Sequence, residues 1–575
     1  MKKIIKKREF YLRNTTKENI SSVTFNIEIL NNLSNDIEKI RDIYKILLNL
    51  GINHKNTKNA LIVLKVLYFI RNNFYNETSK EHSNWWHWEI GYPLLICDIL
   101  ILFNDYYKEE DIRNLLSPTF YFQPNPEYSG NNPVAIHPSG SPLRKSTGGN
   151  RVDLCKLHLL RGLLLNDYSQ IKEAIKALYP VWEINKNIDL KNLENRDGFY
   201  EDGSFIQHGY VPYAGTYGNV LLSGIGEIFY LIKGLNLINP LEIPLIERIK
   251  KSFEPFLYKG SMSDLVNGRA ITRNYSNHKI AHDILNSIFL ISDFYEYNDK
   301  IYLLSLIKRE ILSDNFFDHI KEEQNEFFKK KYVDLLENST IKPLPYKDSS
   351  YIFNEMNRVF YKTNFSSIGL AMHSNKIANY ESFNGENIYG WYTGDGAIYI
   401  EDRGDSYIDY WKNIDFYFIP GTTEILEDMK NKNTSNSLNN MSKSKIAFAF
   451  NNGKNIHAIM DFINYDNCLS SRKEYILSEN KIFYKEFNIK TKKKFYTTIE
   501  NKKVYNKKSF FIEQLSEKIT LIKIDNREYI ITSSNPIKFK FYGENNNFLK
   551  IWIEYEPINL ENLIIEYKIT IYNFD

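Results

Sequence analysis

The sequence predicts an α+β chain, with a helical N-terminal half and an antiparallel β-sandwich in the C-terminal half. Between about residues 37 and 336, apolar residues recur at spacings of three and four, the period of amphipathic helices. Beyond about residue 346 they alternate with polar residues, the period of half-buried strands. The segment 336–345 between these regions holds two prolines and shows neither period. We therefore expect one domain over 1–338 and a second over 346–575.

The helical half consists of apolar segments of similar length. Gly-, Pro- or Asn-rich connectors separate the segments. Many helices of one length, joined by alternating long and short connections, are typical of an (α/α) toroid of helical hairpins. The predicted helices cover 40–50, 61–70, 94–102, 154–165, 219–232, 244–256, 278–294 and 300–312.

Four segments of the C-terminal half show clear alternation of apolar and polar residues. They cover 367–372, 445–450, 518–524 and 549–555. Strands with one apolar face bury it against a second sheet, so a stacked antiparallel sandwich is expected.

Composition excludes several classes of protein. The net charge of +3 is too small to indicate nucleic-acid binding, and the charges of both signs are interspersed. The three cysteines are far apart and lack metal-ligand spacing, so free thiols are expected. The apolar run 92–103 is too short to span a membrane, and no apolar segment follows the basic residues 1–8 as in a signal peptide. We expect a monomer without a metal or cofactor, cytoplasmic if the chain has no leader.

The most informative segment is the loop 197–208, rich in Gly and Asp, which ends at His208. Nine residues later, Tyr217 stands at the mouth of an apolar helical run. An imidazole and a phenol placed in this way are suited to proton transfer.

Three further segments carry candidate site residues. Trp85 and Trp86 follow Asn84 in a stretch with three indoles within four positions, more than a packed core requires, so at least one indole is expected to face a groove. Asn150 lies where a loop enters a helix and is suited to binding a carboxylate, although a simple N-cap explains it equally well. Arg269 and Arg273 are four apart and would face one side of a helical turn.

In their order along the chain, these segments and the loop 384–396 resemble polysaccharide lyase family 8, the hyaluronate, chondroitin AC and xanthan lyases. The matching motifs run from residue 84 to about 423 and include Tyr410 and Trp411. The resemblance implies an (α/α) toroid followed by a β-supersandwich, with an acidic polysaccharide in the cleft between them. It also implies β-elimination of a uronic-acid-containing glycosaminoglycan, of hyaluronan or chondroitin type, giving 4,5-unsaturated ends. Members are normally exported, so a mature secreted or periplasmic form is the other expectation for localisation.

The resemblance assigns roles to individual residues. The catalytic set is expected to contain Asn150, which would bind the uronate carboxylate, together with His208, Tyr217, Arg273 and Glu386. The residues expected to bind the glycan are Asn84, Trp85, Trp86, Arg269 and Asn384. Either His208 or Tyr217 is a candidate base, and the sequence does not divide these roles between them.

Two other functions stay open. A glycoside hydrolase on a helical toroid requires two carboxylates across the scissile bond, and the candidates are Glu201, Asp202, Glu386 and Asp395. A glycan-binding protein without catalysis would keep the aromatic groove alone. His278 and His282 are spaced i, i+4, but a lysine stands where the zinc-protease motif has Glu, which disfavours a metal site.

Overall fold

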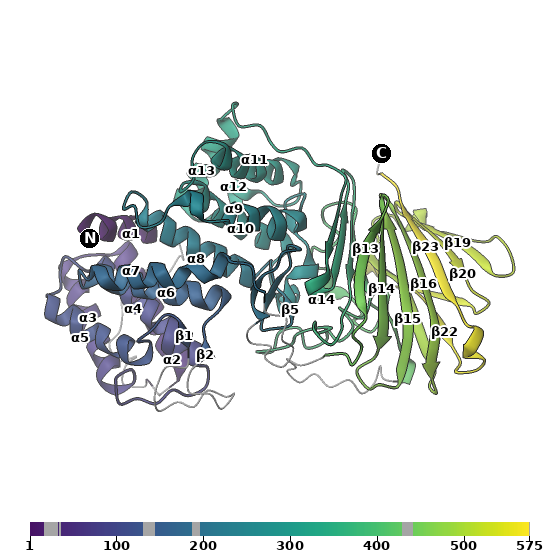
Figure 1. Ribbon diagram of the computed structural model, residues 1–575, viewed down its shortest axis with the longest axis horizontal. Coiled ribbons are helices and arrows are strands. Elements are labelled where there is room, and N and C mark those ends of the chain that lie inside the picture. The colour runs from purple at the N-terminus through teal and green to yellow at the C-terminus, as the bar shows by residue number, and fades with distance from the viewer. Residues whose placement is uncertain (16–32, 34–35, 130–143, 187–195, 428–440, 574–575) are drawn as a thin grey trace.

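A computed structural model shows the chain as a helical half beside a half built of stacked sheets (Figure 1). The N-terminus lies in the helical half, and the C-terminal end lies in the sheet half (Figure 1). The structure describes residues 1–15, 33, 36–129, 144–186, 196–427 and 441–573. Within these residues, no helix is both long and apolar enough to cross a membrane.

The helical half is an (α/α) toroid, as predicted. Helix α8 packs against both α6 and α10, and these helices share one hydrophobic core with the rest of the toroid. The principal helices are α1 (Lys2–Thr15), α2 (Ile37–Asn53), α3 (Thr57–Asn73), α4 (Tyr92–Leu102), α5 (Glu109–Phe122), α6 (Gly148–Leu164), α7 (Tyr168–Leu178), α8 (Tyr217–Ile232), α10 (Asn277–Ser292), α11 (Tyr297–Ser313) and α13 (Glu326–Glu337).

Seven of the predicted helices are confirmed, and the one over 244–256 is wrong in form. That segment is the short helix α9 (Leu245–Arg248), then a π turn, then a 3-10 turn that ends at Phe256. Pro255 in the last turn has no N–H to continue an α-helical ladder. The sequence prediction missed α1, α5, α7 and α13.

The sheet half contains three antiparallel sheets. The first has the order β11-β10-β9-β8 and comprises β8 (Ser349–Phe353), β9 (Arg358–Lys362), β10 (Ser367–Ala371) and β11 (Ala397–Glu401). The second has eight strands in the order β13-β14-β15-β16-β23-β20-β19-β18: β13 (Ala447–Asn452), β14 (Asn455–Ile463), β15 (Leu469–Ser478), β16 (Lys481–Thr491), β23 (Ile565–Ile571), β20 (Arg527–Thr532), β19 (Ile519–Ile524) and β18 (Phe511–Gln514). The third has the order β12-β17-β22-β21, with β12 (Thr423–Ile425), β17 (Phe495–Lys503), β22 (Phe548–Tyr555) and β21 (Ile537–Tyr542).

The first sheet is the layer that joins the two halves. Phe360 of β9 belongs to the core of the helical half, whereas its neighbours Val359 and Tyr361 belong to the core between the sheets. Because successive strand residues point to opposite faces, both faces of this sheet are covered. All five residues of β9 are buried for this reason, whereas buried and half-buried residues alternate along β14. The predicted division between 338 and 346 falls between the end of α13 and the start of β8.

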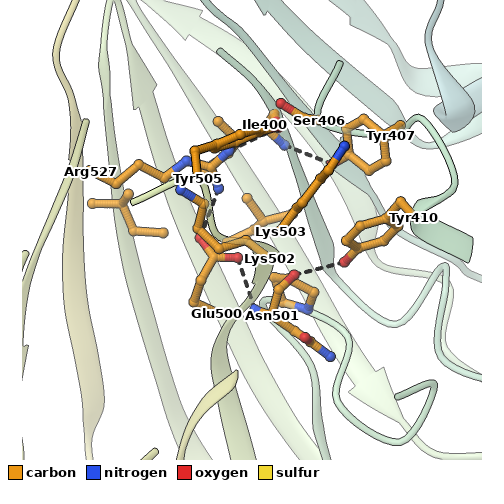
Figure 2. Close-up of a pocket in the computed structure, with 13 residues that line it drawn as sticks. Ile400, Ser406, Tyr407, Tyr410, Glu500, Asn501, Lys502, Lys503, Tyr505 and Arg527 are labelled. Atoms are coloured by element: carbon orange, nitrogen blue, oxygen red, sulfur yellow. Dashed lines mark hydrogen bonds and ion pairs between the residues drawn. The ribbon is translucent and has the colours of Figure 1, made fainter. Parts of the chain in front are cut away.

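A buried polar joint connects the first sheet to the other two sheets, and Figure 2 shows Arg527 and Glu500 of this joint. Arg527 donates to Asp402 at 2.6 Å and to Glu500 at 2.8 Å. The Tyr410 hydroxyl donates to the backbone carbonyl of Asn501 at 2.8 Å, which ties the short helix α14 (Tyr410–Asn413) to β17 (Figure 2). Charges this deeply buried require partners of this kind, so the joint fixes how the strands meet.

A buried imidazole also joins the two halves. His278 of α10 places Nδ1 2.7 Å from Asp314 and Nε2 2.6 Å from the carbonyl of Gly404, in the loop after β11. A carboxylate and a carbonyl both accept, so both ring nitrogens carry protons and His278 is an imidazolium. Burial alone lowers the pKa of His278, but Asp314 and the Gly404 carbonyl hold it above its ordinary value. The other histidine of the i, i+4 pair, His282, lies 2.9 Å from Glu323.

We predict that His278→Gln destabilises the protein most at acidic pH. A raised folded pKa stabilises the fold fully below the unfolded value, about 6.5, and this contribution disappears as pH rises through the folded pKa. Urea unfolding at pH 5.5, 7.5 and 9 should therefore show a gap between wild type and variant that narrows with pH. His54→Gln, at an exposed imidazole, is the control and should show no such trend. A gap that is constant or widens with pH would contradict the assignment.

Candidate functional site

A cleft of about 740 Å³ runs along the helical half where the first loops of the sheet half meet it. Nine of the ten predicted site residues line the cleft: Asn84, Trp85, Trp86, Asn150, His208, Tyr217, Arg269, Arg273 and Asn384. The tenth, Glu386, is bonded to Arg269 and Arg273. Residues as far apart in the sequence as Asn84 and Asn384 thus line the same cleft.

His208 and Tyr217 lie side by side in the cleft. His208 follows strand β4 (Phe205–Gln207) with a left-handed backbone, φ 57°. Tyr217 is the first residue of α8, as its position before an apolar run predicted. The two ring centroids are 4.7 Å apart. One imidazole and one phenol can therefore face the same bound group.

Glu381, which the sequence analysis did not single out, orients His208 and its neighbours through hydrogen bonds. Its buried carboxylate lies 2.5 Å from His208 Nδ1, accepts from Arg269 Nη1 at 2.9 Å, and accepts from the Tyr213 hydroxyl. Burial raises the pKa of Glu381, but the hydrogen bond from His208 and the charges of His208 and Arg269 together hold it below its ordinary value. An ionised carboxylate only accepts, so Nδ1 carries a proton, and whenever the ring is neutral Nε2 is its accepting nitrogen.

The two arginines occupy a short 3-10 helix, η9 (Gly268–Thr272), and its C-cap. Glu386 bridges them: Arg269 Nε donates at 2.7 Å and Arg273 Nε donates at 2.5 Å. Arg269 Nη2 also lies 3.4 Å from the Tyr217 hydroxyl. The structure therefore places Arg269 next to Tyr217, whereas Arg273, expected as the catalytic arginine, points to Glu386 and Tyr275.

Asn150 lies in the first turn of α6, which begins at Gly148 and has Thr147 as its N-cap. The alternative interpretation of Asn150 as the N-cap is therefore wrong. The first turn of a helix has N–H groups without partners inside the helix and carries the positive end of the helix dipole. Because Asn150 also lines the cleft, its amide and this turn together can receive an anion.

A second carboxylate that the sequence analysis missed, Asp197, joins the His208 turn to the start of α6. It accepts from the backbone N–H of Gly209, from Gln207 Nε2 and from Thr147 Oγ1, each at 2.7 Å. The residues on both sides of His208 are thus tied to the N-cap of the helix that carries Asn150.

The indoles divide between core and cleft. Trp88 is buried and packs against Tyr75 and Phe122, whereas Trp85 and Trp86 line the cleft. This confirms the expectation that at least one indole faces a groove. The remaining cleft wall comes from the sheet half, where Phe383 and Asn384 lie in the loop that also holds Glu381 and Glu386.

No pattern in the sequence distinguishes Glu381 from Glu386. Both lie in one polar loop, and the backbone turns sharply between them, with positive φ at Asn384 and Gly385. Which carboxylate reaches His208 depends on that turn and on how the loop meets the toroid. An acidic residue close to the predicted Glu386 was the only available signal.

Two family models match the chain. Residues 17–309 match the model described as polysaccharide lyase family 8, N terminal alpha-helical domain. Residues 348–534 match the model described as polysaccharide lyase family 8, super-sandwich domain.

Known sequences and structures give the same pattern. The chain is 32% identical over 501 residues to a hyaluronate lyase of Staphylococcus aureus, covering 81% of this chain and 60% of that protein. It is 29% identical over 367 residues to a xanthan lyase of Bacillus sp. strain GL1, covering 63% of this chain and 37% of that one. A chondroitin AC lyase of Streptomyces coelicolor A3 superposes with a TM-score of 0.80 at 20% identity, over 99% of this chain and 82% of the other. The matched part thus spans 60% or less of these two sequence relatives.

We predict that Glu381→Gln costs more stability than Glu386→Gln. Removing the charge of Glu381 leaves Arg269 and His208 facing a neutral amide in a buried position, which should cost about 2 kcal/mol or more. The side chain of Glu386 is 26% exposed, so water compensates part of its loss and the cost should stay below about 1 kcal/mol. Urea unfolding of both variants measures this difference. Equal midpoints would mean that Glu381 is not the carboxylate on which the site is built.

Proposed function

Because the chain belongs to polysaccharide lyase family 8, we propose that it cleaves a uronic-acid-containing glycosaminoglycan by β-elimination, with hyaluronan or chondroitin as the substrate class. The observation that carries this proposal is the position of His208 and Tyr217, ring against ring in one cleft. Arg269 touches the phenol, and Asn150 lines the same cleft. Names of relatives support the substrate class, since they include hyaluronate, xanthan and chondroitin AC lyases.

The reaction begins with the proton on C5 of the uronate, which is weakly acidic while the neighbouring carboxylate keeps its full charge. Asn150 and the first turn of α6 would donate hydrogen bonds to that carboxylate and stabilise the charge that develops as the proton leaves. The electrons of the C5–H bond then form the C4–C5 double bond. The bond between C4 and the glycosidic oxygen breaks, and that oxygen takes a proton. No water is consumed, and one product carries a 4,5-unsaturated uronate.

His208 and Tyr217 supply the proton acceptor and donor for these steps. Glu381 keeps Nδ1 of His208 protonated, which leaves Nε2 to accept. The Arg269 guanidinium, whose Nη2 lies 3.4 Å from the Tyr217 hydroxyl, would stabilise negative charge that develops on the phenol oxygen during proton transfer. Both groups lie on the cleft wall, within reach of one sugar ring.

The rest of the cleft suits an acidic chain of sugars. Trp85 and Trp86 offer aromatic faces on which sugar rings can pack, and Lys145 adds an exposed positive charge. Asn84 and Asn384 offer amides for hydroxyl groups. We propose that the protein acts as a monomer, since the site is complete within one chain.

The hydrolase alternative requires two carboxylates on opposite sides of a scissile bond. All four of its candidates are engaged: Glu201 is exposed and pairs with Lys251, Asp202 accepts backbone N–H groups, Asp395 pairs with His373, and Glu386 pairs with Arg269 and Arg273. The carboxylates that do line the cleft are Asp153 and Asp197. Asp197 accepts three hydrogen bonds and Asp153 pairs with Lys156, so neither is placed as a free acid.

We predict a rise in ultraviolet absorbance from unsaturated uronate when the protein is incubated with hyaluronan or chondroitin. Dermatan and xanthan serve as comparison polymers, and a chelator should leave the rate unchanged because no step in this scheme uses a metal. Chain shortening without absorbance would show hydrolysis and contradict the proposal. The absence of both absorbance and chain shortening with all four polymers would also contradict the proposal.

We also predict that Tyr217→Phe and His208→Asn each lower kcat by about 10²- to 10⁴-fold, the usual contribution of general acid–base catalysis. Affinity for the glycan, measured by calorimetry, should change little, because each variant keeps the shape of the cleft. Tyr210→Phe is the matched control, because Tyr210 is another phenol on the cleft wall. A Tyr217→Phe variant as active as Tyr210→Phe would remove Tyr217 from the mechanism.

A further inference from the structure

The proposed function leaves one matched motif without a role, the pair Tyr410 and Trp411. Both residues belong to α14, in the sheet half, and Trp411 is only 7% exposed. Its indole Nε1 donates to Asp264 of the helical half at 2.7 Å. Asp264 does not line the cleft, yet it begins the segment that carries both cleft arginines.

Asp264 connects this indole to the arginine turn. Its second oxygen accepts from Asn267 Nδ2, also at 2.7 Å. Asn267 is fully buried and is the N-cap of the 3-10 helix that holds Arg269. The backbone carbonyl of Asn267 accepts from the hydroxyl of Thr216, the residue before Tyr217. One carboxylate thus lies between the sheet half and the backbone that positions the guanidinium and the phenol.

The turn fits its surroundings closely. Gly268 has φ 54°, and a Cβ there would lie 2.1 Å from the ring of Tyr213, whose hydroxyl accepts from the Arg269 backbone N–H. Gly369 of β10 leaves room in the same way for Leu265, where a Cβ would come within 2.3 Å. The segment is therefore pressed between the toroid and the first sheet and has little freedom to move by itself.

The sheet half holds Trp411 firmly. The neighbouring Tyr410 is bonded to the Asn501 carbonyl of β17 (Figure 2). Trp411 stacks on Tyr407 at 6.2 Å with an interplanar angle of 22°. Arg358 of β9 adds a second tie, since its Nε donates to the Leu265 carbonyl at 3.0 Å.

We propose that Asp264, held by Trp411, is a positioning residue for the arginine turn, so that the sheet half determines where the Arg269 guanidinium meets Tyr217. Asp264 touches neither substrate nor reacting atoms and acts through Asn267 and the backbone of η9. This inference rests on the proposed lyase function for its activity readouts. The ionised carboxylate accepts from Trp411 on one oxygen and from Asn267 on the other, and a proton on either oxygen weakens that oxygen as an acceptor, so protonation of Asp264 loosens the turn.

The buried surroundings of Asp264 bring the pKa of its carboxyl into a pH range in which activity can be measured. Burial raises the pKa of Asp264 to about 6, and the hydrogen bonds from Trp411 and Asn267 oppose that rise. The other titratable or charged groups among the described residues that face it or line the two hollows beside it are Glu401, His278, Tyr258, Tyr399, Tyr407, Arg273, Tyr275, Asp409, Tyr410 and Lys412. Activity should therefore decline below about pH 6 as Asp264 takes a proton.

The test compares the pH profiles of kcat/KM for Asp264→Asn, Trp411→Phe and wild type. Trp411→Phe removes one donor from the carboxylate, so the acid limb of the profile should move to higher pH. Asp264→Asn should lower kcat/KM about tenfold at pH 7.5, the loss expected for one hydrogen bond to a charged group, and should remove this acid limb. Trp552→Phe is the matched control, because its indole donates to Glu554 at 3.0 Å on β22, and its profile should follow wild type.

The outcomes separate a positioning role from simple packing. If Trp411→Phe and Trp552→Phe lower activity equally at every pH, or if Asp264→Asn keeps the wild-type acid limb, the proposal is wrong. Should Asp264→Asn fail to fold, the Trp411→Phe profile alone decides.

A readout that does not depend on turnover is ¹⁹F NMR of 5-fluorotryptophan-labelled protein. The Trp411 resonance should titrate with a midpoint near pH 6 in wild type and stay constant in Asp264→Asn. An inactive wild type that still shows this titration would overturn the proposed lyase function but not the Asp264–Trp411 contact.

Discussion

The candidate site depends on one buried carboxylate, that of Glu381. It comes from the sheet half, and the groups it accepts from, His208, Tyr213 and Arg269, all belong to the helical half. A buried charge is tolerated only when it is paired and hydrogen-bonded. If the two halves separated, the carboxylate and the guanidinium would each lose compensation at once. His208 and Arg269 therefore gain the carboxylate that orients them only when the halves are docked, although both residues lie on the toroid.

Docking is made rigid by a sheet in which three of the four strands, β9, β10 and β11, are buried on both faces. Lys362 of β9 reaches across to the toroid and donates to the carbonyls of Glu254, Pro255 and Leu257. Those carbonyls lie at and directly after the end of the irregular segment that follows α9, and carbonyls at the C-terminal end of a helical segment have no partner within it. The end of this segment thus supplies acceptors for the neighbouring domain.

Much of the fold could be predicted from periodicity, because amphipathic helices such as α2 and half-buried strands such as β19 show their period in the sequence. Helix α1 could not, since its basic residues obscure the buried Ile4, Ile5 and Leu12. In the site, short motifs located the cleft residues because each residue lies at the start or end of an element. What periodicity and motifs cannot predict is pairing across the two halves. Glu381 and Asp264 act through partners more than a hundred residues away, and that separation leaves no local pattern.

The charge balance of the cleft bears on how an acidic substrate would bind. Arg269 and Arg273 face two carboxylates, Glu381 and Glu386, so the two guanidinium groups carry no uncompensated charge before a ligand arrives. A uronate carboxylate placed against them would have to compete with Glu386. Asn150 and the first turn of α6 present donors without a competing acid in hydrogen-bond contact with the Asn150 amide among the described residues. Under the proposed function, a uronate would therefore bind best on the α6 wall, and Arg269 would act on the phenol and not on the substrate charge.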